Sequence, residues 1–146
     1  MGLWTYGYDL AGNLTSQTDG KNQTLIFGYD SQGRVRTKQY PGGAQITWTY
    51  DDPAMPFSKG RLTRVVDLTA DTSFGYDAIG EVVETTRIID GTTFTMSQGY
   101  DAVGRVTSRT FPDNETVTYS YKLGWLTVGA PRLPGKSPPG GPCPRT

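Results

Sequence analysis

One short motif recurs along the chain and constrains its fold more than any other feature of the sequence. A tyrosine, usually followed by aspartate, stands a few residues before a glycine. The six copies comprise Tyr8, Asp9 and Gly12; Tyr29, Asp30 and Gly33; Tyr50, Asp51 and Gly60; Tyr76, Asp77 and Gly80; Tyr100, Asp101 and Gly104; and Tyr121 and Gly124. Successive tyrosines are 21, 21, 26, 24 and 21 residues apart. Self-similarity at a nearly fixed period indicates a repeat architecture in which each copy is one supersecondary unit.

Each copy is predicted to be a β-hairpin. An aliphatic residue stands two positions after each glycine, as Val35 follows Gly33, and aromatic residues alternate before several tyrosines, as in Trp48 and Tyr50. Turn-forming segments such as "DGKN", "PGGA", "DGTT" and "PDNE" separate the two. Period-two alternation of β-branched and aromatic residues is typical of strands, and glycine, proline and asparagine favour chain reversals. The sequence therefore predicts an all-β fold of consecutive antiparallel hairpins, about twelve strands in one curled or spiral sheet.

The segment from the aspartate to the residue after the glycine is predicted to be the corner between hairpins. An aspartate at the start of a turn accepts a hydrogen bond from the backbone N–H two residues on, and glycine tolerates positive φ. A corner of five residues places the tyrosine and the aliphatic residue on one face of the sheet. The same alternation predicts that the basic residues occupy the opposite face, namely Arg34, Arg36, Lys38, Arg61, Arg105 and Arg109.

Composition agrees with an open sheet and predicts one ordered region. Of the 146 residues, 35% are hydrophobic, which is few for a packed globular core. A single sheet with one aromatic face has no second layer within the chain to cover it. We expect residues 3–128 to form the hairpin array. Residues 129–146 are rich in proline and glycine, and we expect a disordered tail there.

The residue types present exclude most kinds of catalytic and metal site. There is no histidine and one cysteine, Cys143, so neither a Ser-His-Asp triad nor an intrachain disulfide is possible. One aspartate per repeat, with about 10 Å between repeats, does not supply the converging oxygens that calcium needs. The adjacent Asp51 and Asp52 are better explained as turn residues than as paired catalytic acids. We therefore expect no enzymatic activity and no cofactor.

Charge and hydropathy bear on partners and location. The formal net charge is zero, which does not favour nucleic-acid binding. No apolar stretch approaches the about 20 residues of a membrane span. The first residues lack the basic region and the apolar segment of a secretion signal, so we expect the chain to be cytoplasmic when it is expressed alone.

The aromatic stripe has two interpretations. Tyrosine and tryptophan rings stack on sugars, so Trp4, Tyr6, Trp48 and Tyr50 are candidate glycan contacts of a surface adhesion module. Cross-strand aromatic pairs are also ordinary stabilisers of sheets. The stripe is then the hydrophobic face of a wall, covered by a neighbouring turn of the sheet or by enclosed cargo.

The segments "YDLAGNLTSQTDG", "YDSQGRVRTKQYPGG", "YDAIGEVVETTRIIDG" and "YDAVGRVTSRTFPDNE" resemble the YD repeat of the Rhs family, which is related to Tc-toxin subunits and teneurins. The resemblance covers the chain from Leu3 to about Val128. It implies a spiral β-sheet that closes a shell around a C-terminal toxin domain in the bacterial members. In those members an autoproteolytic cut releases the toxin, but Asp52-Pro53 lacks the following Gly-Leu of the cleavage signature, so cleavage is not assigned here.

The resemblance also implies the role and the partners. We expect a non-catalytic piece of shell wall, a fragment that contacts further YD repeats of a larger shell or a second copy of itself. The enclosed toxin domain is the second expected partner. The implied location is secreted or at the cell surface, as part of a larger assembly.

Overall fold

The computed structural model describes residues 2–122 and 125–128, and these residues form twelve β-strands and no helix. The strands are β1 (Thr5–Tyr8), β2 (Leu14–Thr18), β3 (Thr24–Tyr29), β4 (Val35–Gln39), β5 (Gln45–Tyr50), β6 (Leu62–Val66), β7 (Asp71–Tyr76), β8 (Val82–Ile89), β9 (Thr92–Tyr100), β10 (Val106–Thr110), β11 (Thr116–Lys122) and β12 (Trp125–Val128). The predicted all-β fold of consecutive antiparallel hairpins is confirmed. Residues 129–146, including Cys143, lie outside the described part of the chain, as does Gly124.

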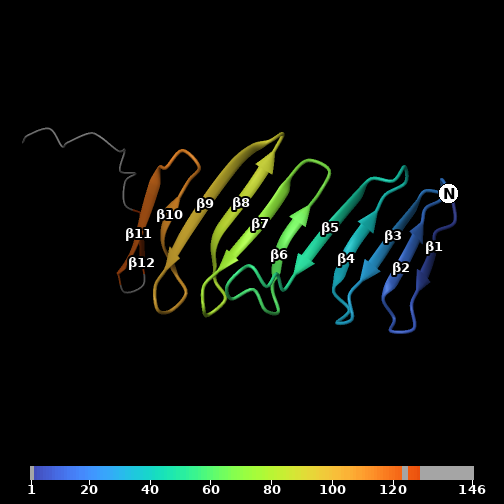
Figure 1. The fold of residues 1–146 in the computed structure, drawn as a ribbon, viewed down its shortest axis with the longest axis horizontal. Helices are drawn as coiled ribbons and strands as arrows, with labels where there is room; N and C mark the ends of the chain where they lie inside the picture. Colours follow the sequence, from blue (N-terminus) through green and yellow to red (C-terminus); the bar gives the residue numbers. More distant parts are fainter. Residues whose placement is uncertain (1, 123–124, 129–146) are drawn as a thin grey trace, which may run out of the picture. The chain divides into compact units, whose positions relative to one another are not determined.

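The chain divides into two compact units, Met1–Thr95 and Met96–Thr146. The first unit holds β1–β8 and the start of β9. The second holds the rest of β9 and β10–β12. Within each unit every strand is antiparallel to the strand that follows it in the chain (Figure 1). No helix long and apolar enough to cross a membrane occurs in the described residues.

The predicted corner length is confirmed. Four corners contain five residues each: 9–13, 30–34, 77–81 and 101–105. In every copy the tyrosine lies opposite the aliphatic residue that follows the glycine. These pairs are Tyr8–Leu14, Tyr29–Val35, Tyr50–Leu62, Tyr76–Val82, Tyr100–Val106 and Tyr121–Leu126. Corner length and register therefore agree with the requirement that both side chains share a face.

A β-bulge follows the aliphatic residue in each of the first five copies. In β2, for example, Leu14 lies opposite Tyr8 but Ser16 lies opposite Gly7, so Thr15 has no partner in the register. Equivalent shifts occur beside Tyr29, Tyr50, Tyr76 and Tyr100. The extra residue reverses the alternation of faces along the rest of the strand. Sequence alternation alone does not reveal this reversal.

The bulge makes the predicted position of Lys38 and Arg109 wrong. We define the tyrosine face as the side of each unit's sheet that carries the corner tyrosines and the residues two and four positions before them. Lys38 lies opposite Phe27, two residues before Tyr29, and its Nζ is 5.9 Å from the centre of the Phe27 ring. In the second unit, Arg109 lies opposite Gln98, two residues before Tyr100. These basic residues belong to the tyrosine face.

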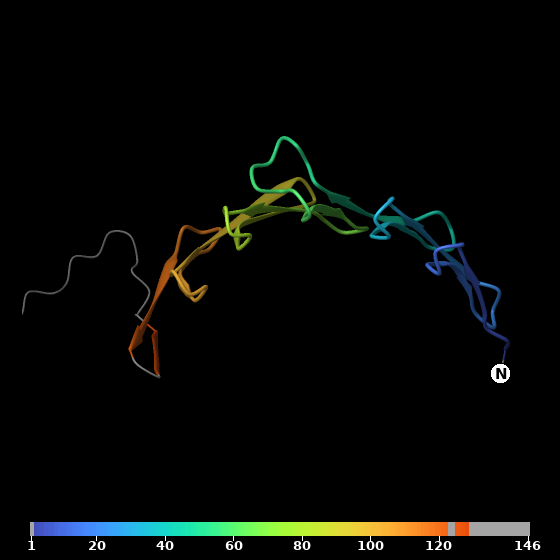
Figure 2. The ribbon, with the colours of Figure 1, turned by 90° about the horizontal axis from the view of Figure 1, so that it is seen from below.

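The residues whose burial is described form no conventional hydrophobic core in either unit. Among the residues whose burial is described, Ala70 is the one buried hydrophobic side chain, and Ser58 and Thr63 are the buried polar ones. Seen edge-on, the first unit is a single layer, from which the loop of residues 51–61 projects (Figure 2). The backbone hydrogen bonds of the sheet and contacts along its tyrosine face hold these strands together.

Candidate functional site: the row of Tyr-Asp corners

The aspartate of each corner holds the turn closed from within. In the first corner, Oδ1 of Asp9 accepts hydrogen bonds from the backbone N–H of Ala11 at 2.9 Å and of Asn13 at 2.8 Å. Gly12 has a φ of 86°, a conformation that favours glycine, and its N–H donates to the Asp9 carbonyl at 3.1 Å. The same carboxylate pattern recurs at Asp30, Asp77 and Asp101.

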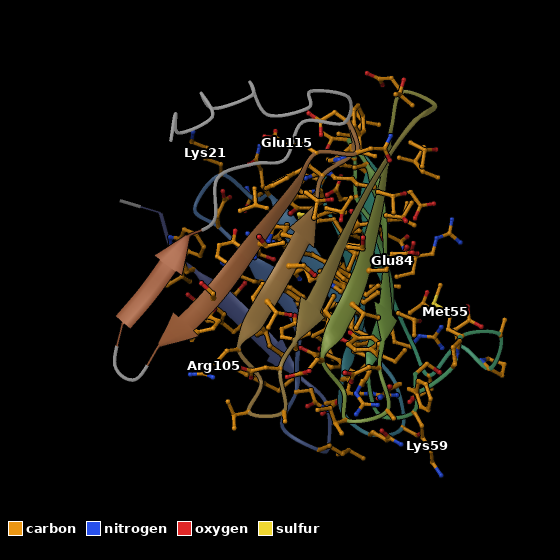
Figure 3. The ribbon with its side chains drawn as sticks, turned by 90° about the vertical axis from the view of Figure 1, so that its left-hand side faces the viewer. Lys21, Met55, Lys59, Glu84, Arg105 and Glu115 are labelled. Carbon is orange, nitrogen blue, oxygen red and sulfur yellow. The ribbon has the colours of Figure 1, made fainter. Side chains whose placement is uncertain are left out.

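Three hairpin turns at the other ends of the strands, 19–23, 40–44 and 111–115, use the same five-residue conformation. Asp19 accepts from the N–H groups of Lys21 at 2.8 Å and Gln23 at 2.9 Å, and its own N–H donates to the Gln23 carbonyl. Asn22 takes the positive φ that Gly12 has in the corner. The segment "DGKN" is therefore equivalent to a corner, although its sequence does not contain the Tyr-x-x-x-Gly motif. In the second unit, Arg105 and Glu115 mark a corner and a turn at opposite ends of the strands (Figure 3).

The arginine after the glycine connects one corner to the next. Nε of Arg34 lies 2.7 Å from Oδ2 of Asp30 in its own corner, and one terminal nitrogen lies 2.5 Å from Oδ2 of Asp51 in the following corner. Its guanidinium carbon is also 4.3 Å from the centre of the Tyr50 ring. Cation–π contact of this kind is favourable. Arg34 thus contacts both acidic groups and the next tyrosine.

Equivalent arginines repeat the contact with the following tyrosine. In the second unit Arg105 is 2.7 Å from Asp101 and 4.5 Å from the Tyr121 ring centre. In the first unit Arg61 is 5.5 Å from the Tyr76 ring centre. The predicted placement of these arginines on the opposite face is wrong, because each one extends over the tyrosine of the following copy.

A second link joins consecutive copies through the tyrosine hydroxyl. Tyr29 donates to the carbonyl of Leu14 at 2.8 Å, Tyr76 to that of Leu62 at 2.6 Å and Tyr121 to that of Val106 at 2.8 Å. Each acceptor is the aliphatic residue that follows the previous corner. Its carbonyl lies where the bulge interrupts the regular ladder, so the hydroxyl meets an acceptor at the point of irregular pairing. Sequence reasoning did not find this bond.

The corner carboxylates are held in the ionised form. The hydrogen bond from Arg34 is the main cause that lowers the pKa of Asp51, with a further contribution from the Gly60 N–H. At Asp101 the backbone N–H of Arg105 is the largest cause of the lowered pKa, and partial desolvation opposes it. Hydrogen bonds to a carboxylate favour its charged form. The carboxylates therefore serve as turn acceptors rather than proton donors.

The glycine before the tyrosine is a further position that sequence reasoning missed. A Cβ at Gly7 would lie 2.5 Å from Oγ of Ser16, and one at Gly99 would lie 2.7 Å from Oγ of Ser108. The equivalent Gly28 meets Oγ1 of Thr37 at similarly close range. The recurrence of Gly-Tyr-Asp in the sequence was a usable signal for this contact, because only glycine fits opposite a serine or threonine placed so near.

The third corner is an eleven-residue loop, 51–61, with its own internal bonds. Asp51 has a φ of 58° and its carboxylate accepts from the Gly60 N–H. Oδ1 of Asp52 accepts from the Ala54 N–H at 2.9 Å, and the Ser58 hydroxyl donates to the Asp52 carbonyl at 2.7 Å. Asp51 and Asp52 thus bind different partners within the loop. This arrangement favours the interpretation as turn residues over paired catalytic acids.

The candidate glycan contacts lie on one face but in two separate places. Trp4 and Tyr6 lie at β1, whereas Trp48 and Tyr50 are on β5, about 19 Å away at the usual strand spacing. The Arg34 guanidinium covers the Tyr50 ring. In the described part of the chain, no cluster of three or more aspartate, glutamate or cysteine side chains is placed to hold a metal ion.

Comparison with known proteins agrees with this geometry. Residues 8–45 and 100–132 match the family model described as RHS Repeat. No curated protein sequence matches the chain.

The fold is similar to that of solved toxin structures. Crystal structures of TcdB2-TccC3 and TcdB2-TccC3-TEV each match with a TM-score of 0.56 and 16% sequence identity. TcdB2-TccC3 without its hypervariable C-terminal region matches with a TM-score of 0.55 and the same identity. Each match covers 92% of this chain and 9% of the solved chain. With its repeated corners and this match to the repeat model, the chain carries repeats of the Rhs, or YD-repeat, family.

Proposed function

We propose that this chain is a non-catalytic wall segment of an Rhs-type shell that encloses a C-terminal toxin domain. The observation that carries the proposal is the linkage of consecutive corners through Arg34 and Tyr29 and their equivalents. Such links join hairpins edge to edge and leave the sheet one layer thick. A one-layer sheet with almost no internal core is suited to separating two spaces rather than to forming a catalytic pocket.

The proposal includes the extent of the array and its partners. Residues 3–128 form the array, and residues 129–146 form a tail beyond it. Further YD repeats, of a larger shell or of a second copy of this chain, contact the outer edges of the array, and the enclosed toxin domain faces one side. The assembly is of bacterial origin and acts outside the cell or at the cell surface. The fold likeness to TcdB2-TccC3 supports the shell architecture.

A segment replacement in TcdB2-TccC3 tests this function. Residues 3–128 replace the matching 9% of the solved chain, and assembly is measured by the yield of a single species in gel filtration and by electron microscopy. We expect the chimaera to assemble. The matched control carries Asp30→Ala and Arg34→Ala, which break the link between the second and third corners and should reduce the yield. A chimaera that fails while a same-length replacement from another Rhs protein succeeds would contradict the proposal.

The glycan-binding alternative receives less support. The Arg34 guanidinium occupies one face of the Tyr50 ring, where a sugar would have to stack. A glycan array with the full chain and the Trp48→Ala variant tests it. Binding that depends on Trp48 would revive the adhesion function, and the shell proposal predicts equal background signals from both proteins.

A further inference from the structure

Trp4, just before β1, and Tyr6 and Tyr8 of β1 are more exposed than the equivalent residues of β3 and β5. Trp4, Tyr6 and Tyr8 are 51%, 54% and 63% exposed, whereas the corresponding Leu25, Phe27 and Tyr29 are only partly exposed. The difference has a simple cause. A preceding strand covers β3 and supplies the carbonyl that Tyr29 binds, but β1 is paired only with β2 among the described residues. The edge of β1 therefore presents one half of a contact that the chain builds repeatedly.

The register of that contact is constant. In each hairpin one residue of the second strand lies opposite the residue that precedes the corner tyrosine. On its other side, the same residue pairs with the residue three positions before the next corner tyrosine. Ser16 pairs with Gly7 and Ile26, Thr37 with Gly28 and Thr47, Arg64 with Thr49 and Ser73, and Ser108 with Gly99 and Thr118. Four internal examples thus define which residues meet when one hairpin is added to the next.

The last strand carries the complementary half. Leu126 of β12 lies opposite Tyr121, and Thr127 lies opposite Ser120, the residue before that tyrosine. Thr127 therefore occupies the register position of Ser16, although this corner has no bulge. Among the described residues β12 is paired only with β11, and no described strand pairs with its other edge.

We propose that the β12 edge of one copy of this chain binds the β1 edge of a second copy, head to tail. Applying the internal register places Thr127 opposite Thr5 and Val128 opposite Trp4 of the second copy. In this proposal the hydroxyl of its Tyr8 donates to a β12 carbonyl near Leu126, in place of the bulge carbonyl that Tyr29 binds at Leu14. The interface continues the one between consecutive hairpins. It joins unlike edges, so it allows chains of more than two copies. This proposal rests on the proposed function in one respect: it assumes that the contacts between consecutive corners serve to assemble hairpins.

Sedimentation velocity of the full chain over a concentration series tests the proposal. We expect association that increases with concentration. Tyr8→Phe removes only the hydroxyl and should weaken association about 2- to 10-fold, the effect of one hydrogen bond. Tyr76→Phe is the matched control, because it deletes the same bond inside one chain and should leave the association constant unchanged. Oligomers weakened by Trp48→Ala but not by Tyr8→Phe would indicate pairing through the tyrosine face and would overturn the proposal.

Cross-linking tests the register directly. In a Cys143→Ser background, Thr5→Cys with Thr127→Cys places the two thiols on neighbouring strands, and mild oxidation should produce covalent dimers and longer species. Thr5→Cys with Thr118→Cys is the control. Its sites are two strands apart in the proposed assembly, beyond the about 7 Å limit for a disulfide. Equal cross-linking of both variants, or a wild-type chain that stays monomeric at every concentration, would overturn the proposal. The segment replacement buries both edges within a longer chain, so it can succeed where this association fails.

Discussion

The glycine before each corner tyrosine has little room for a side chain. Gly28 lies opposite Thr37, and the threonine oxygen occupies the space that a Cβ at position 28 would need. A β-branched side chain has few alternative rotamers, so Thr37 cannot easily move aside. The tyrosine itself is less restricted, because its ring lies on the open face of the sheet.

The Gly28→Ala variant should lose about 1–3 kcal/mol of unfolding free energy, the usual cost of overpacking. In a Thr37→Ala background the same substitution should cost little, because the colliding oxygen is absent. Urea denaturation of the two single variants and the double variant, followed by circular dichroism, gives the coupling energy. Additive costs would show that the close approach does not restrict this position.

The lowered pKa of Asp101 predicts acid sensitivity. The Asp101 carboxylate binds a proton less tightly in the folded state than in the unfolded state, so its ionised form stabilises the fold. This stabilisation is present above the unfolded pKa of about 3.9. It is lost as the pH falls through the lower folded pKa. The denaturation midpoint of the chain should fall below about pH 4. Asp101→Asn should flatten that dependence, measured by denaturation at a series of pH values. Asp101→Ala should be less stable at neutral pH as well, and an unchanged pH profile in Asp101→Asn would contradict the assignment.

At the level of elements, the corner with its bulge is a module that tolerates insertion. The third copy places eleven residues between β5 and β6 where other copies have five, yet Tyr50 still lies opposite Leu62. The tyrosine face determines this register, because a shift by one residue would turn every side chain of the strand to the wrong side. The hydrogen bonds within the loop then order its own backbone.

Replacing residues 51–61 by Asp-Ser-Gln-Gly-Arg, the sequence of residues 30–34, should therefore preserve the register of β5 and β6. Shortening the loop from eleven to five residues gains only about 0.7 kcal/mol of closure entropy. Nuclear Overhauser contacts between Tyr50 and Leu62 would verify the register. Their loss, with strand signals retained elsewhere, would mean that the longer loop is required.

At the level of the whole molecule, each unit is stabilised by neighbouring strands rather than by a central core. Ala70 is the one buried hydrophobic residue among those whose burial is described. The stability of repeat arrays is approximately a sum of terms for each repeat and for each interface between neighbours. Apolar burial per residue is correspondingly low.

The heat capacity of unfolding should therefore lie below the about 12–15 cal/mol/K per residue of compact domains, because that quantity follows the apolar area exposed on unfolding. Differential scanning calorimetry at a concentration where the chain is monomeric measures it. The Tyr8→Phe variant serves as a control for contributions from association. A value in the usual range would show that a further apolar layer is buried.

The sequence by itself predicted the strands, the corners and their length. The period of the tyrosines, the aspartate acceptors and the glycines act within a few residues, so local physical chemistry determines them. The pairing of Tyr50 with Leu62 was also predictable, since one face of the strand had to stay consistent.

Only the tertiary structure decided which side chains link the copies. In each of the first five copies, the bulge adds one residue to the strand that follows the corner. This extra residue places Lys38 and Arg109 on the tyrosine face, a position that the alternation of residues along a strand cannot predict. The bonds from Tyr29 to Leu14 and from Arg34 to Asp51 join residues 15 and 17 positions apart. Their geometry depends on the register of three successive strands at once, and no local pattern in the sequence encodes that register.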